Sequence, residues 1–185
     1  MQYFNSQLLY TLSNFTTYIS TPEWSMKTLI LQRHAKAEKD GDDDMSRPLS
    51  PVGLSNAAIQ GENLRQLEIF PELIIHSPAM RTRQTAEIMA VKLELSQGYT
   101  VEDSELYTCD SSELVSIIRN LPDDVNSVLI VGHNPAIETT ADALALSGFG
   151  HFRPSEAAIF NFDIEEWRAI SPRNCLDNKF LPKPE

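Results

Sequence analysis

Short apolar runs alternate with longer stretches of mixed character along most of the chain. Three of the runs are nearly all apolar, namely residues 28–32 (TLILQ), 72–76 (ELIIH) and 127–132 (SVLIVG). Such runs are typical of strands that helices cover on both faces of a mainly parallel sheet. Residues 157–164 (AAIFNFDI) alternate in polarity as a strand does, and residues 167–170 (WRAI) are a candidate edge strand.

Stretches with helical character follow these runs. Ser50 and Pro51 mark one helix start, because serine is a favoured N-cap and proline is tolerated at the first helical position. Pro78 marks a second start, and Asn134 is the candidate cap of a third. Residues 111–121 predict a further helix. The alternation predicts an α/β fold, a three-layer α/β/α sandwich with a mainly parallel sheet.

The chain is predicted to hold one domain with an extension at each end. Its 185 residues are enough for a single domain with a sizeable core. Residues 1–25 contain no Lys or Arg, unlike a signal peptide, and are predicted to be an N-terminal extension outside the domain. The domain is predicted over residues 26–170. Residues 171–185 contain prolines and no periodicity, which predicts a C-terminal tail.

Charge and cysteine content narrow the classes of partner. The chain has 15 Lys and Arg against 26 Asp and Glu, a formal charge of −11, which argues against nucleic acid or an anionic membrane as partner. No apolar stretch approaches the length of a spanning helix. Cys109 and Cys175 have no metal-ligand spacing around them, so we expect free thiols, no metal site and a cytoplasmic location.

Residues that can bind an anion follow three of the predicted strands. The first strand ends at Arg33 and His34, and the third ends at His133. The second ends at Ser77, with Arg81 in the first turn of the helix that follows. Ligands bind at the carboxyl ends of strands in open α/β sheets, so we expect these side chains to converge. Arginine can grip two phosphoryl oxygens and neutral histidine is a competent nucleophile, which predicts a phosphoryl pocket without metal or cofactor.

The segments around these residues resemble the histidine phosphatase superfamily, specifically its short SixA-like phosphohistidine phosphatases. The likeness rests on three ordered motifs: LILQRHAKAE (29–38), HSPAMRTRQTAE (76–87) and LIVGHNP (129–135). It extends through RPLSPVGLSNA and RPSEAAIFNFD, and so covers about residues 26–170. One such motif alone is weak evidence, whereas three in order are specific. The resemblance implies a phosphoglycerate mutase-like fold.

The resemblance also implies roles for individual residues. His34 would be the nucleophile that is transiently phosphorylated, and Arg33 and Arg81 would clamp the phosphoryl oxygens. His133 would complete the pocket and stabilise charge during transfer. The resemblance further suggests two secondary phosphate contacts, Ser77 and Asn134. Many members have glycine after the motif histidine, whereas this chain has Ala35, as some short SixA-like members do.

The general acid is not specified by the motifs. Many members of the superfamily protonate the leaving group with a carboxylate from the segment before the third motif, where this chain offers Glu105 and Asp110. The imidazole of a phosphohistidine leaves more easily than an alkoxide, so a strong dedicated acid is less necessary for such a substrate. That chemistry is compatible with a SixA-like enzyme.

The predicted function is hydrolysis of N-phosphohistidine on a partner protein, as in signal transduction. The stretch from Arg81 to His133 holds little beyond one helix and its connections, so no lid is expected, and an open site suits a side chain presented by another protein. The resemblance implies a histidine-phosphotransfer domain or a phosphocarrier protein as partner. Two alternatives stay open: a phosphatase for small phosphate esters and a non-catalytic phosphoprotein-binding module. The acidic run at residues 40–45 is expected to be a solvated loop, or to repel free polyanions or meet a basic partner.

Overall fold

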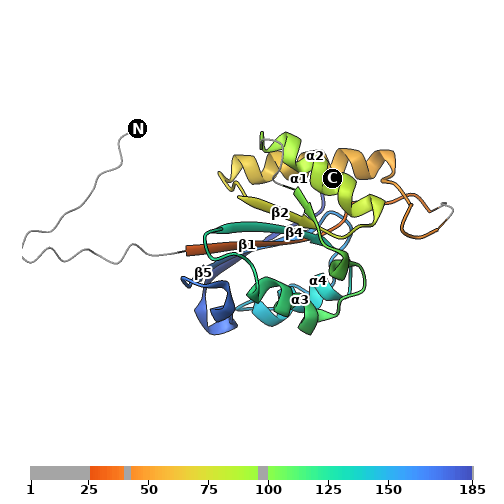
Figure 1. Ribbon diagram of the computed structural model, residues 1–185. Helices are drawn as coiled ribbons and strands as arrows, with labels where there is room; N and C mark the ends of the chain where they lie inside the picture. The colour runs from red at the N-terminus through yellow and green to blue at the C-terminus, as the bar shows by residue number, and fades with distance from the viewer. Residues whose placement is uncertain (1–25, 40–42, 96–99, 185) are drawn as a thin grey trace, which may run out of the picture.

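A six-stranded sheet forms the centre of the molecule (Figure 1). The computed structural model describes residues 26–39, 43–95 and 100–184, so the predicted extension at residues 1–25 lies outside the described part. The strands run in the order β3-β2-β4-β1-β5-β6. In chain order they are β1 (Met26–Arg33), β2 (Leu73–His76), β3 (Thr100–Glu102), β4 (Ser127–Gly132), β5 (Ala157–Asp163) and β6 (Cys175–Leu181). Strands β1 to β4 pair in parallel, whereas β5 is antiparallel to both β1 and β6.

Helices cover both faces of this sheet. They are α1 (Pro51–Gln66), α2 (Met80–Lys92), α3 (Ser111–Arg119) and α4 (Ala136–Leu144), with short 3₁₀ helices η1 (Ser104–Tyr107), η2 (Trp167–Ala169) and η3 (Pro172–Asn174). Figure 1 shows α1 and α2 on one face of the sheet and α3 and α4 on the other. The predicted three-layer α/β/α sandwich with a mainly parallel sheet is therefore confirmed. Across the described ranges, no helix combines the length and the apolar character needed to span a membrane.

Strand β1 supplies side chains to both halves of the core, which explains why its centre, residues 29–31, is entirely apolar. Ile30 packs with Leu64 and Met89 in the cluster between the sheet and the α1–α2 layer. Leu29 and Leu31 point to the opposite face, into the cluster that α3 and α4 cover. All five side chains are fully buried, and each such burial stabilises the fold by about 1.5–3 kcal/mol. Burial on both faces holds the end of β1, and thus the residues that follow it, in place.

The helix starts follow the predicted signals in one case and deviate in another. Ser50 caps α1, since its hydroxyl accepts a hydrogen bond from the Gly53 amide at 3.2 Å. The second helix begins at Met80 rather than at Pro78, and its N-cap residue makes no side-chain hydrogen bond. Ser77 contributes near this start, because its hydroxyl accepts a hydrogen bond from the Ala79 amide at 3.4 Å.

The C-terminal segment differs from the prediction of a tail. Residues 175–181 form β6, the edge strand beside β5, with Cys175 and Leu181 buried at its two ends. Polar residues occupy most of the strand between them because one side of an edge strand faces solvent, and this hides the apolar signal. The candidate edge strand at residues 167–170 is wrong. Its Trp167 is fully buried in η2 and donates its indole N–H to the carbonyl of Val125 at 2.8 Å.

Both cysteines are free thiols, as the sequence predicts. Cys109 is half-buried, and burial, together with nearby Glu113, raises the pKa of its thiol to about 11. Burial also raises the pKa of Cys175. Because the thiolate is the reactive form, neither residue has the environment of a nucleophile.

A close approach between α1 and the segment after His34 makes Gly53 a sensitive position. A Cβ atom at Gly53 would lie 2.0 Å from the carbonyl oxygen of Lys36, and backbone cannot move aside cheaply. We therefore expect Gly53→Ala to lower the free energy of unfolding by about 3 kcal/mol, measured by chemical denaturation. Gly148→Ala is the matched control, since its Cβ would lie 3.4 Å from Oδ1 of Asp142, an ordinary van der Waals distance. Equal stability of the two variants would contradict this interpretation of the contact.

Candidate active site

The ends of β1, β2 and β4 bring the predicted residues together at one edge of the sheet. The ring centroids of His34 and His133 lie 5.2 Å apart. The hydroxyl of Ser77 is 2.9 Å from Nε2 of His133, and Nη2 of Arg81 is 3.5 Å from its Nδ1. Residues up to 99 positions apart in the chain, from His34 to His133, thus form one cluster. Parallel strands with their carboxyl ends at the same edge explain the convergence.

The backbone on both sides of His34 is held by the sheet. Its amide donates to the carbonyl of Gly132 at 3.0 Å, and its own carbonyl accepts from the amide of Ser155 at 3.1 Å. Nδ1 of the ring lies 2.7 Å from the carbonyl of Ala35. A carbonyl can only accept, so this nitrogen carries the proton and Nε2 presents a lone pair. The neutral tautomer is therefore oriented with its nucleophilic nitrogen unprotonated.

His133 is also set in one neutral tautomer. Arginine can only donate, so Nδ1 of His133 faces Arg81 with its lone pair, while Nε2–H donates to the Ser77 hydroxyl. Burial, followed by the positive charge of Arg81, lowers the pKa of His133 to about 4. Burial is likewise the largest cause at His34, with further contributions from His133, Arg81 and Arg33, and lowers its pKa to about 3.

These two pKa values predict unusual behaviour in acid. A lowered histidine pKa means that the neutral form persists to lower pH, so both rings should stay neutral at pH 5.5, where an ordinary histidine is mostly protonated. Ring ¹⁵N chemical shifts in nuclear magnetic resonance spectra report the protonation state directly. We expect no titration of His34 or His133 between pH 8 and about 5. Midpoints near 6.5 for the two site rings would contradict the structure.

Arg33 is held by the loop that follows α4. Its Nη1 donates to the carbonyl of Phe152 at 2.6 Å. The same carbonyl accepts from the side-chain amide of Asn134 at 3.0 Å, and the Phe152 amide donates to Glu138 at 3.0 Å. Asn134 does not cap α4 as predicted, because Pro135 holds the N-cap position; its NH₂ group donates instead to Phe152 and Glu138. It supports the backbone that orients Arg33, and its predicted phosphate contact stays a prediction.

Arg81 is engaged by an aspartate that the sequence did not single out. Its Nη2 forms a 2.8 Å ion pair with Oδ2 of Asp44, and its Nη1 donates to the Asp44 carbonyl at 2.5 Å. Tyr107 donates its hydroxyl to the same Oδ2 at 3.1 Å, and Arg47 pairs with Oδ1 at 2.8 Å. The hydrogen bond from Arg81 is the main cause that lowers the pKa of Asp44 to about 2.

Residues 43–45 of the acidic run form an exposed turn, as expected, but Asp44 also pairs with Arg81; residues 40–42 lie outside the described part of the chain. Asp44 is one of four aspartates within residues 40–44, and nothing in the local pattern separates it from its neighbours. Tyr107 is a second residue that sequence reasoning missed. Its ring packs edge-on against His133 with centroids 5.7 Å apart, and it forms a wall of the cluster.

The two predicted general acids lie away from these contacts. Glu105 is exposed on η1, the 3₁₀ helix that also carries Tyr107. Asp110 is the N-cap of α3 and accepts hydrogen bonds from the amides of Ser112 and Glu113 at 2.8 and 2.9 Å. These bonds, chiefly the one from Glu113, lower the pKa of Asp110, which disfavours proton donation. A general-acid role for either residue stays a prediction.

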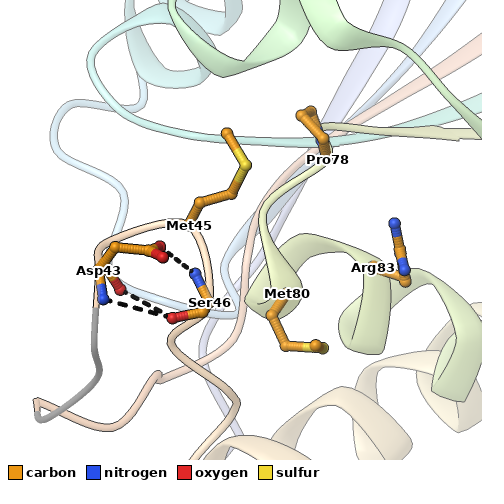
Figure 2. A pocket seen from close by; sticks show the side chains of 6 residues that line it. All are labelled: Asp43, Met45, Ser46, Pro78, Met80 and Arg83. Carbon is orange, nitrogen blue, oxygen red and sulfur yellow. Dashed lines mark hydrogen bonds between the residues drawn. The ribbon is translucent and has the colours of Figure 1, made fainter.

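An open pocket adjoins the cluster, between the loop that carries Asp44 and the start of α2. Its volume is about 260 Å³. Figure 2 shows the side chains that line it and the hydrogen bonds that close the turn from Asp43 to Ser46; the lining residues are Asp43, Met45, Ser46, Pro78, Met80 and Arg83. Loop and helix are joined by a backbone hydrogen bond of 2.8 Å between Met80 and Met45. None of the residues that line this pocket belongs to the histidine–arginine cluster, so the pocket is a hollow beside the cluster and not the cluster itself.

Comparison with known proteins places this geometry in a family. Residues 29–106 match the model of the histidine phosphatase superfamily (branch 1). Phosphohistidine phosphatase SixA of Escherichia coli (strain K12) is 30% identical over 111 residues, which are 59% of this chain and 68% of that protein.

Solved structures show the same fold. A candidate SixA phosphohistidine phosphatase from Nakamurella multipartitia has a TM-score of 0.73 and 26% identity, over 86% of this chain and 98% of that one. A phosphoglycerate mutase from Plasmodium falciparum shares the fold at a TM-score of 0.56 and 17% identity, over 85% and 89% of the two chains. The predicted phosphoglycerate mutase-like fold is confirmed. The chain belongs to branch 1 of the histidine phosphatase superfamily, as a SixA-like phosphatase.

Proposed function

We propose that this phosphatase hydrolyses N-phosphohistidine on a partner protein, with a covalent phosphohistidine intermediate on His34. The observation that carries the proposal is the unprotonated Nε2 of His34, held in one cluster with Arg81 and His133. An imidazole that is neutral at working pH can attack phosphorus without first losing a proton. The nucleophile is therefore active over the whole physiological range.

The proposed first step transfers the phosphoryl group to the enzyme. Nε2 of His34 forms a bond to phosphorus while the P–N bond of the substrate breaks, and the departing imidazole keeps the electron pair and takes up a proton. In the second step water attacks phosphorus, the bond to His34 breaks, and inorganic phosphate leaves. The ring of His34 keeps the electron pair of that bond and is neutral again. One proton of the water goes to solvent, which balances the proton that the departing imidazole took up in the first step.

Positive charge around His34 would stabilise the phosphoryl group as it passes between the two nitrogens. Arg33 and Arg81 would offer guanidinium donors, one held by the carbonyl of Phe152 and the other by the carbonyl of Asp44. Fixed donors cost little reorganisation when the transferring group develops charge, and this is a large contribution to catalysis. His133 adds an imidazole that gains a proton more readily once a phosphate dianion lies beside it.

The open surroundings of the cluster favour a protein as substrate. Between α2 and β4, the described residues add only β3, η1 and α3, and no domain encloses the site. The similar enzyme of E. coli is named for phosphohistidine hydrolysis. We infer a phosphorylated histidine-phosphotransfer domain or a phosphocarrier protein as the partner, since each presents phosphohistidine at a protein surface.

A substrate panel tests this function. The purified chain is assayed for phosphate release from a phosphorylated histidine-phosphotransfer domain, a phosphorylated phosphocarrier protein, and sugar phosphates. We expect kcat/KM on at least one phosphohistidine protein to exceed that on every ester. Faster turnover of an ester would favour the small-ester alternative, and binding without turnover would favour a non-catalytic module.

A further inference from the structure

The carboxylate of Asp44 is bound to the guanidinium of Arg81, which the proposed function needs for binding phosphate. Its Oδ2 lies 2.8 Å from Nη2 of Arg81, the same nitrogen that is 3.5 Å from His133. Arg81 is 7% exposed, so few water molecules can solvate its charge, and Asp44 is an anion that neutralises it. A phosphoryl group bound between Arg81 and His133 would bring a second anion to the same nitrogen.

Two anions cannot share this donor without mutual repulsion. The carboxylate of Asp44 is 53% exposed at the side chain, so it can turn outward without crossing the core. Arg47 already pairs with its other oxygen, Oδ1, at 2.8 Å and provides a partner for the displaced carboxylate. The side chain of Asp44 thus has a second position available to it.

The backbone of Asp44, by contrast, is held in place. The turn is closed by the 2.7 Å hydrogen bond from the Ser46 amide to the Asp43 carboxylate, and Met45 accepts the Met80 amide at 2.8 Å. The Asp44 carbonyl accepts from Nη1 of Arg81 at 2.5 Å. One nitrogen of the guanidinium can therefore stay tethered to backbone while the other exchanges its partner.

From this geometry we infer that Asp44 is an internal competitor for the phosphoryl site: it holds Nη2 of Arg81 in the free enzyme, is displaced by a phosphoryl oxygen, and weakens retention of inorganic phosphate. The inference rests on the proposed function only in placing a phosphoryl group at Arg81. It assigns Asp44 a role in selectivity, because a ligand must displace the carboxylate to bind. The low pKa of Asp44, about 2, keeps the competitor charged at every working pH.

Phosphate binding tests the competition directly. Inorganic phosphate is titrated into the intact protein at pH 7.5 and low ionic strength by isothermal calorimetry. We expect Asp44→Asn to bind phosphate about tenfold more tightly than the wild type, because the variant lacks the repulsion between the carboxylate and the phosphate. A tenfold change in affinity lies between the values that Coulomb's law gives for two charges about 4 Å apart in water and near a protein surface. The gain should shrink as salt is added, because the carboxylate is partly exposed.

Asp43→Asn is the matched control. It removes the same charge from the neighbouring position, where the carboxylate accepts a hydrogen bond from the Ser46 amide and does not pair with Arg81. We expect Asp43→Asn to change the affinity for phosphate less than twofold. Asp44→Glu keeps the charge, so its affinity for phosphate should stay close to that of the wild type. Weaker or unchanged phosphate binding in Asp44→Asn would overturn the inference, since it would make Asp44 a positioning residue for Arg81 or a bystander. An equal gain in Asp43→Asn would also overturn it, in favour of a general field from the acidic run.

The readout separates this inference from the proposed function. Phosphate affinity is measured without any phosphohistidine substrate, so a chain that fails on every phosphohistidine protein can still show the tenfold gain. Conversely, a chain that hydrolyses phosphohistidine and shows no gain would keep its function and lose the competitor. Circular dichroism of each variant confirms that the comparison is made between folded proteins.

Discussion

Replacement of His34 by asparagine is expected to lower turnover of a phosphohistidine protein at least about 10⁴-fold, because it removes the nucleophile of the proposed covalent path. The residual rate would come from phosphate binding alone, since Arg33, Arg81 and His133 keep their positions. Radiolabelled phosphoprotein adds a second measurement. The wild type should carry acid-labile phosphate after rapid quenching, and His34→Asn should carry none.

The control for this variant is His151→Asn. His151 is exposed and pairs with Glu138 at 2.8 Å, so its loss should leave turnover within about twofold. A His34→Asn protein that still turned over at the wild-type rate would end the proposal of a covalent intermediate. Label on a variant that lacks His34 would instead move the nucleophile to another residue.

The second large effect is expected at Arg81. Arg81→Ala removes both the guanidinium that would grip the phosphoryl group and the neighbour of His133, and should lower kcat/KM by about 10²–10³-fold. Arg81→Lys keeps the charge without the planar pair of donors, so it should recover only part of that loss. Arg81→Ala also removes the ion pair between Arg81 and Asp44, so denaturation curves must show that both variants still fold.

Arg83→Ala is the comparison, because it removes the same side chain two residues along the same helix. Arg83 is exposed and pairs with Glu102, so its loss should change kcat/KM less than twofold. If Arg81→Ala and Arg83→Ala behaved alike, the phosphate would not be bound by Arg81, and the site would have to lie elsewhere.

The accuracy of the fold prediction depended on how far each strand is buried. Strand β1 is covered on both faces, so its run is apolar and its position could be inferred from residues 28–32 alone. Strand β6 has an exposed side, so its polar residues look like a tail. Strand β3 spans only Thr100–Glu102 and is largely exposed, which leaves too few positions for a periodic pattern. Edge strands were missed for this common reason.

The same distinction applies to the site. His34 and His133 each follow a buried strand, so the rule that ligands bind at carboxyl ends was enough to group them before any contact was known. Asp44 and Tyr107 follow no such strand. They lie 37 positions before and 26 positions after Arg81, on a loop and a 3₁₀ helix. Only the folded chain shows that Asp44 pairs with the guanidinium and that Tyr107 donates to the same carboxylate.

The amino-acid order by itself determined the α/β class, the buried strands and the set of histidines and arginines at their ends, because burial and strand termination leave local patterns. The tertiary structure alone decided which nitrogen of each imidazole is free and which anion holds Arg81. The contacts of His133 with Ser77 and of Arg81 with Asp44 join segments 56 and 37 positions apart in the chain, whereas the His34 tautomer is set by the neighbouring carbonyl of Ala35. A surface aspartate carries no local pattern that distinguishes it from its neighbours, so its partner is defined only once the chain has folded.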